Sequence, residues 1–289
     1  MSLVNIKSML QKALRDCYAI LHVNVVNYDM IKIAALTAQE TKSPIIIAIS
    51  EKALKGFNGP KDFADLVRHV VKQYKITIPL AIHLDHGEYK TVISAIKAGF
   101  TSVMYDGSKL PLTTNLKNTR RIVTLAHAKN ISVECEVGTV PGKSKDHGAK
   151  GQLATVQECK LMVQTGIDAL AAGIGNLHGN YPKDWQGLNF QRLEEIHQAI
   201  PNTPLVLHGG SGIPANQIKK AIQLGVCKFN VGTELLVAFS KELARYFIEG
   251  EYRDKHGYDL RNYFPQGLNK IRDVIMEKLK FLGSYNKTR

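Results

Sequence analysis

The sequence predicts an α/β fold, a (β/α)₈ barrel of the TIM-barrel type with a C-terminal helical extension, and we expect residues 1–289 to form one domain. Eight short runs rich in β-branched residues alternate with segments whose apolar residues have helical spacing. The runs are almost continuously apolar, which is typical of parallel strands buried on both faces. No linker rich in Pro, Gly or Ser divides the units. A doubly wound open sheet is the alternative, but no GxGxxG motif follows the first run.

The predicted elements follow one another along the whole chain. Between the strands, "DFADLVRHVVKQY" and "KKAIQLG" show the helical pattern clearly. The first 20 residues lack the continuous apolar centre of a secretion signal and predict a short amphipathic helix. After about residue 234, a long helix, the polar stretch "GEYRDKHGYDLRNYF" and a final amphipathic helix form the extension. The eight predicted strands are residues 18–25, 44–50, 78–85, 101–106, 131–138, 168–175, 204–210 and 227–233.

Composition narrows the class of protein. With 44% hydrophobic and 22% charged residues, the chain can bury a sizeable core. No apolar run approaches the length of about 18 residues that a membrane span needs. The four cysteines form no CxxC pair, which favours reduced thiols and a cytoplasmic location.

A net charge of +13 suggests an anionic partner. The basic residues are spread along the chain, with few clusters beyond "NLKNTRR". This distribution favours a phosphorylated substrate over nucleic acid.

Polar residues stand where the predicted strands end. In a (β/α)₈ barrel these ends form one rim, where the chemistry collects. The rim residues are therefore expected to converge although they are far apart in sequence. They are Asn24, Ser50, Asp85, His86, Asp106, Glu134, Glu136, Asn176, His178, His208 and Asn230.

Three rim histidines predict a metal site. His86, His178 and His208 follow the third, sixth and seventh strands, and each precedes a glycine. Three imidazoles with one open position are the usual ligands of a catalytic zinc ion. Beside a cation, Asp85 would stay ionised and could take a proton from a substrate hydroxyl. The alternative for Asp85 is a helix N-cap for the segment that starts near Tyr89.

Two glycine-rich turns predict a phosphate site. "HGGSGIP" follows the seventh strand and leads into a helix that starts near Pro214, and "KFNVGTE" ends the eighth strand. Backbone N–H groups at helix N-termini bind phosphate, and this fold commonly places phosphate after strands seven and eight.

With these motifs laid out, the chain resembles the class II, metal-dependent fructose-bisphosphate aldolases from residue 1 to about residue 285. The motifs are "SPIIIAISE", "AIHLDHG", "AGFTSVMYDGS", "SVECEVGTV", "TGIDALAAGIGNLHGNY", "PLVLHGGSGIP", "KFNVGTE" and "GYDLRNY". The resemblance implies reversible cleavage of fructose 1,6-bisphosphate to dihydroxyacetone phosphate and glyceraldehyde 3-phosphate in glycolysis. It also implies a homodimer or homotetramer without a membrane anchor. Tagatose 1,6-bisphosphate aldolases share nearly all the motifs and are the closest alternative.

The resemblance also implies roles for particular residues. Asp85 matches the residue that shuttles the proton of the C4 hydroxyl, and His86, His178 and His208 match the ligands of a Zn²⁺ ion that acts as a Lewis acid. Asp106 and Glu136 match acids associated with a second metal. Arg261 matches a basic residue that reaches the distal phosphate, sometimes from a neighbouring subunit. A monovalent cation, Na⁺ or K⁺, is implied beside the phosphate loops. The substrate-binding residues implied are Asn24, Gly179, Gly209, Gly210, Ser211, Asn230, Val231, Gly232 and Thr233, with Arg261.

Two departures from the family pattern bear on catalysis. In "GTVPGKSKDHGAKGQ", Lys143, Ser144 and Lys145 stand where the acid that protonates C3 is expected, and Asp146 is the nearest substitute. Gly232 stands where relatives commonly carry Asn or Asp, which would remove a hydrogen bond worth about 0.5–1.5 kcal/mol. These changes motivate a further alternative, a phosphosugar-binding barrel that has lost catalysis.

Overall fold

The closed barrel is built from parallel strands that neighbour one another in chain order. The computed structural model describes residues 2–142, 151–179 and 181–288, and within them eight strands close into the predicted barrel. The (β/α)₈ prediction is confirmed. The strands are β1 (Ile20–Asn24), β2 (Ile45–Ser50), β3 (Leu80–Gly87), β4 (Ser102–Tyr105), β5 (Ser132–Val137), β6 (Ala169–Ala172), β7 (Leu205–Leu207) and β8 (Val226–Val231).

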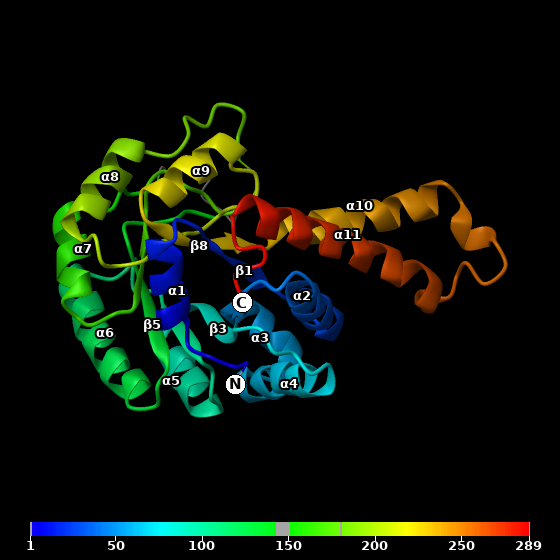
Figure 1. Cartoon of the computed structure of the whole chain (residues 1–289), viewed down its shortest axis with the longest axis horizontal. Coiled ribbons are helices and arrows are strands. Elements are labelled where there is room, and N and C mark those ends of the chain that lie inside the picture. Colours follow the sequence, from blue (N-terminus) through cyan, green and yellow to red (C-terminus); the bar gives the residue numbers. More distant parts are fainter. Residues whose placement is uncertain (1, 143–150, 180, 289) are drawn as a thin grey trace.

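Helices surround the barrel and extend beyond it (Figure 1). In the described chain they are α1 (Ile6–Arg15), α2 (Tyr28–Glu40), α3 (Glu51–Leu54), α4 (Pro60–Gln73), α5 (Tyr89–Ala98), α6 (Leu112–His127), α7 (Val156–Val163), α8 (Phe190–Ala199), α9 (Ala215–Gln223), α10 (Thr233–Ile248) and α11 (Leu260–Phe281), with 3₁₀ turns at Lys55–Phe57 and Glu251–Arg253.

Local sequence explains several of the helix starts. Asn27 accepts a hydrogen bond from the backbone N–H of Met30 at the start of α2. Thr155 and Glu158 form a reciprocal capping box at the start of α7. Helix α9 begins directly after Pro214, as the turn motif predicts.

Strands β6 and β7 each end three residues earlier than predicted. Strand β6 ends at Ala172 rather than 175, and β7 ends at Leu207 rather than 210. In both cases glycines follow, and Gly175 and Gly209 have φ values of +89° and +67°. These left-handed conformations turn the chain away from the sheet and into the loops of the rim.

Strand β3 differs in the opposite sense, because it continues through His86 to Gly87. His86 has a φ of +49°, and the register with β4 shifts between Leu84 and Gly87. The irregularity is a β-bulge, a feature that re-aims side chains at barrel rims. It places the side chain of His86 above the barrel interior rather than in the regular alternation.

The two ends of the barrel are closed differently. At the end where the strands begin, Ile6 and Leu10 of α1 pack against Ile20, Ile46 and other apolar residues of the barrel interior. At the other end the strands deliver polar side chains. The long helices α10 and α11 lie alongside each other and project as an arm away from the barrel (Figure 1).

No helix in the described part of the chain combines the length and apolar character needed to cross a bilayer.

Candidate active site

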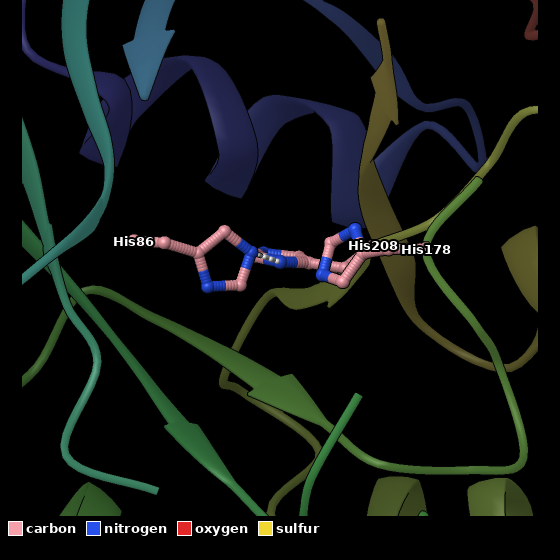
Figure 2. Close-up of side chains that lie close together, drawn as sticks. All are labelled: His86, His178 and His208. Atoms are coloured by element: carbon pink, nitrogen blue, oxygen red, sulfur yellow. Dashed lines mark hydrogen bonds between the residues drawn. The ribbon is translucent and has the colours of Figure 1, made fainter. Parts of the chain in front are cut away.

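Three histidines from separate strand ends meet on the rim of the barrel. His86 is the second-last residue of β3, His178 lies in the loop after β6, and His208 directly follows β7. One ring nitrogen from each lies within 4.8 Å of the others. Ring centroids are 4.5 Å apart for His86 and His208 and 4.8 Å apart for His86 and His178. Figure 2 shows the three rings close together, with a dashed line between His86 and a neighbouring ring.

Carboxylates hold two of these rings from behind. The Nδ1 atom of His86 lies 2.9 Å from Oδ2 of Asp106, and Nε2 of His208 lies 2.9 Å from Oε1 of Glu134. This leaves Nε2 of His86 and Nδ1 of His208 facing each other at 2.7 Å (Figure 2). If both rings donate to their carboxylates, the facing atoms are two lone pairs, and only a proton or a metal ion between them removes the repulsion. Backing of this kind is the usual support of metal-binding histidines.

The surroundings of His86 are strongly negative. Burial opposes the charge on His86, but Asp85, Asp106 and Glu136 raise the pKa of its imidazole to about 10. Burial, together with Asp106, raises the pKa of Glu136 to about 8. An environment that favours a proton on His86 also favours a divalent cation.

Glu136 and Asp106 are placed differently. Oε2 of Glu136 is buried without a hydrogen-bond partner among the described residues and lies 3.7 Å from Nδ1 of His208. Both oxygens of Asp106 are engaged, one by His86 and the other by the backbone N–H and hydroxyl of Ser108. The donor set of three imidazoles and an unsatisfied carboxylate oxygen fits a zinc ion, with Asp106 in a supporting position.

Asp85 lies beside the histidines at the end of the barrel interior. It is 3% exposed, and it accepts hydrogen bonds from Nδ2 of Asn24 at 2.9 Å and Nδ2 of Asn230 at 3.3 Å. Burial alone would raise the pKa of Asp85, but His86, the other neighbouring histidines and Lys228 hold it well below its ordinary value. The alternative that Asp85 caps a helix is wrong, because α5 starts at Tyr89 with Glu88 as its N-cap.

A cavity joins Asp85 to the glycine-rich turns. Most of the predicted substrate-binding residues line it. The lining consists of Asn24, Asp85, His178, Gly179, Gly209, Gly210, Ser211, Asn230, Gly232 and Thr233.

Glycine is required at two of these positions. A Cβ atom on Gly209 would lie 2.0 Å from the carbonyl oxygen of Leu177, and one on Gly210 would lie 2.5 Å from the ring of Phe229. Helix α10 begins at Thr233 beside the cavity without a side-chain cap. In its first turn the backbone N–H of Glu234 donates to Oγ of Ser211 at 3.2 Å. Small residues and a helix N-terminus suit an anionic group.

Two predicted substrate-binding residues lie outside this cavity. The side chain of Val231 is 1% exposed and packs in the hydrophobic core, because it points to the opposite face of β8 from Asn230. Its side chain therefore does not reach the cavity, and the predicted part of Val231 in ligand binding falls to its backbone. Arg261 lies in the arm at the start of α11, and its side chain is 87% exposed and paired with Asp259.

Comparison with known proteins agrees with this geometry. The family model described as fructose-bisphosphate aldolase class-II matches residues 4–287. The chain belongs to that family. The resemblance seen in the sequence motifs is thereby confirmed.

Individual relatives match over their whole length. The fructose-bisphosphate aldolase of Mycoplasma genitalium is 46% identical over 287 residues, which is 99% of both chains. That of Streptococcus pyogenes serotype M3 is 43% identical, covering 99% of this chain and 100% of the relative. The crystal structure of the YdjI aldolase from Escherichia coli superposes with a TM-score of 0.84 at 30% identity, covering 99% of this chain and 100% of that one.

Sequence reasoning missed one buried residue of this aldolase-family barrel. Lys228 is 0% exposed, and its ammonium lies 2.6 Å from Oε2 of Glu134 and 3.2 Å from Nε2 of His83. Glu134 was noted on the rim but received no role. The signal was present, because Lys228 alternates with Asn230 on β8 and must face the same side of the strand.

The C3 acid is expected at Lys143, Ser144 and Lys145, with Asp146 as the nearest substitute, and these positions lie outside the described residues.

Proposed function

We propose that the protein is a zinc-dependent aldolase that reversibly cleaves fructose 1,6-bisphosphate to dihydroxyacetone phosphate and glyceraldehyde 3-phosphate in glycolysis. The observation that carries this proposal is the meeting of three imidazoles beside a buried, ionised Asp85 at the mouth of a glycine-lined cavity. Membership of the class II aldolase family supports it.

His86, His178 and His208 would hold the zinc ion, with Asp106 and Glu134 orienting two of the rings. When bound, the ion would supply a Lewis acid that stabilises negative charge developing on the substrate. Glu136, whose Oε2 is buried without a hydrogen-bond partner among the described residues, would be the carboxylate available to a second metal position.

Asp85 would accept the proton of the C4 hydroxyl as the bond between C3 and C4 breaks. Its lowered pKa keeps the carboxylate ionised before the reaction. Asn24 and Asn230 each donate one hydrogen bond to it, so that both carboxylate oxygens are fixed in direction. A fixed base needs little reorganisation when the substrate arrives.

The phosphate of the dihydroxyacetone phosphate half would lie against Gly179, Gly209, Gly210, Ser211 and the N-terminus of α10. Backbone N–H groups and the helix dipole favour a dianion there. We also expect a monovalent cation, Na⁺ or K⁺, beside these loops, which a dependence of KM on the salt used would detect. The four unpaired cysteines support a cytoplasmic enzyme.

The decisive test is cleavage of fructose 1,6-bisphosphate and its tagatose epimer before and after a chelator, with Zn²⁺ then added back. We expect cleavage of the fructose substrate to be lost on chelation and recovered with zinc. A preference for the tagatose epimer would show that tagatose 1,6-bisphosphate, rather than fructose 1,6-bisphosphate, is the substrate. Absence of cleavage by the zinc-loaded protein, with dihydroxyacetone phosphate still bound, would instead identify a binding barrel without catalysis.

We further propose a homodimer or homotetramer formed through the projecting arm. Its surface carries exposed apolar side chains, among them Ile248 at 84% and Tyr258 at 73%. Arg261 does not line the cavity of its own chain, so its side chain would act at the active site of a neighbouring subunit. Ile248→Glu should reduce the mass measured by light scattering, and Arg261→Ala should raise KM with kcat nearly unchanged. A wild-type mass near 32.0 kDa would contradict the assembly.

A further inference from the structure

An ammonium group lies inside the barrel below the candidate metal site. Lys228 of β8 is fully buried and does not line the active-site cavity, so it cannot touch a substrate held there. Removing a charge of this kind from water costs several kcal/mol unless partners compensate. Its partners are Glu134 of β5 and His83 of β3.

Glu134 connects this ammonium to His208. Its Oε2 accepts from Nζ of Lys228 at 2.6 Å, and its Oε1 lies 2.9 Å from Nε2 of His208. All three side chains are 0% exposed, so no solvent molecule competes for these bonds.

The direction of each hydrogen bond follows from the lysine. An ammonium group has three donors and no acceptor. The carboxylate of Glu134 therefore accepts at Oε2 and remains an acceptor at Oε1, which requires a hydrogen on Nε2 of His208. The other nitrogen of His208, Nδ1, then presents a lone pair toward His86.

Lys228 fixes the tautomer of a second histidine in the same way. Nε2 of His83 must accept from the ammonium, so Nδ1 of His83 carries the hydrogen and donates to Oγ of Ser102 at 2.8 Å. This branch leads away from the metal site and provides an internal control.

We propose that Lys228 is a positioning residue for metal binding: through Glu134 it fixes His208 in the one tautomer and orientation that offers Nδ1 to a divalent cation. This inference rests on the proposed function, in which His208 is a zinc ligand. It goes beyond that function by assigning the ligand geometry to a side chain that touches neither metal nor substrate.

The test compares Lys228→Met, Glu134→Gln and the double variant. Zn²⁺ affinity is measured by competition with a chromophoric chelator, and ligand geometry by the visible absorption of the Co²⁺-loaded protein. We expect Lys228→Met to weaken zinc binding about 10–100-fold and to change the cobalt spectrum, which is the usual effect of removing a group that supports a ligand.

Glu134→Gln is expected to weaken zinc binding as well. Its amide oxygen will turn toward the Lys228 ammonium, so the NH₂ group will face Nε2 of His208 and favour the wrong tautomer. In the double variant no Lys228 ammonium attracts the amide oxygen of the glutamine at position 134. That oxygen can then accept a hydrogen bond from Nε2 of His208. The double variant should therefore bind zinc more tightly than Glu134→Gln alone, by up to about tenfold, the value of one hydrogen bond.

Ser102→Ala is the matched control, because it removes a buried partner of His83 without touching the branch to His208. Its zinc affinity should stay within about twofold of the wild type. If Lys228→Met does not fold, the double variant, which buries no unpaired charge, carries the test together with Glu134→Gln.

Two results would overturn the inference: wild-type zinc affinity and cobalt spectrum in Lys228→Met, or a double variant that binds zinc no better than Glu134→Gln. A failure of the proposed function would give a different experimental result. In that case His208→Ala would leave the zinc affinity unchanged, whatever the Lys228 variants do.

Discussion

The two halves of the barrel interior are equally buried but chemically opposite. Where the strands begin, the interior contains Ile20, Ile46, Ala81 and other apolar side chains, and α1 covers them. One inward position further along, β1 and β3 carry His22 and His83, and the neighbouring interior positions of β5 and β8 are Glu134 and Lys228. Both layers are 0% exposed or nearly so. Burial by itself therefore does not distinguish structural from functional residues in this molecule.

The difference lies in what each layer contributes to the free energy. The apolar layer stabilises the fold through the hydrophobic effect and close packing. The polar layer requires desolvation of charges, which its ion pairs offset only in part. We therefore expect changes in the apolar layer to alter stability, and changes in the polar layer to alter metal binding and catalysis.

The largest effect is expected at the top of the polar layer. Asp85→Asn keeps the shape of the side chain but removes the proton acceptor, so kcat should fall about 10²–10⁴-fold. Zinc content should be unchanged. Steady-state cleavage and metal analysis measure the two quantities, with Asp62→Asn on the surface as the control. Loss of zinc from folded Asp85→Asn would make Asp85 a ligand rather than the base.

In the apolar layer the expected effect is on folding. Ile46→Ala removes three buried methyl or methylene groups and should lower the free energy of unfolding by about 2–5 kcal/mol. Urea denaturation measures this, while kcat and zinc affinity should remain within about twofold of the wild type. The contrast between the layers would fail if this variant lost zinc at unchanged stability.

The last effect concerns a histidine within the polar layer. His22 has no hydrogen-bond partner for either ring nitrogen among the described residues, and burial together with Lys228 lowers its pKa from 6.5 to about 3. Between these values the unfolded chain binds a proton that the folded protein does not. His22 therefore makes stability fall as pH falls from about 6.5 toward 3, by up to about 1.4 kcal/mol per pH unit.

Measuring the free energy of unfolding from pH 7 to pH 4 checks this dependence of stability on pH. The slope should become shallower in His22→Leu, and the exposed His69→Leu should keep the slope of the wild type. Equal slopes in wild type and His22→Leu would show that the pKa of His22 is the same in the folded and the unfolded chain.

Much of the architecture was predictable because strand and helix periodicity are local. All eight strands occur in the predicted order, and the polar strand ends converge, since parallel strands in a closed barrel end on one rim. The ends of β6 and β7 were predicted too late, because hydrophobic pattern alone does not show where a left-handed glycine takes the chain out of the sheet.

Less of the site was predictable, because its geometry depends on groups that meet across the barrel. The bulge that re-aims His86 is a matter of register between β3 and β4. The pairing of Lys228 with Glu134 joins residues 94 positions apart. Sequence alternation shows that both face inward, but not that they touch.

By itself the sequence determined the kind of fold, the strand order and the set of residues available at the rim, because these follow from side-chain periodicity and from the identity of the residues. Only the tertiary structure decided which nitrogen of each histidine faces the shared space, which acids support them and that Arg261 lies away from its own cavity. Those outcomes depend on distances of a few ångströms between distant segments, and such distances are set by packing of the whole barrel.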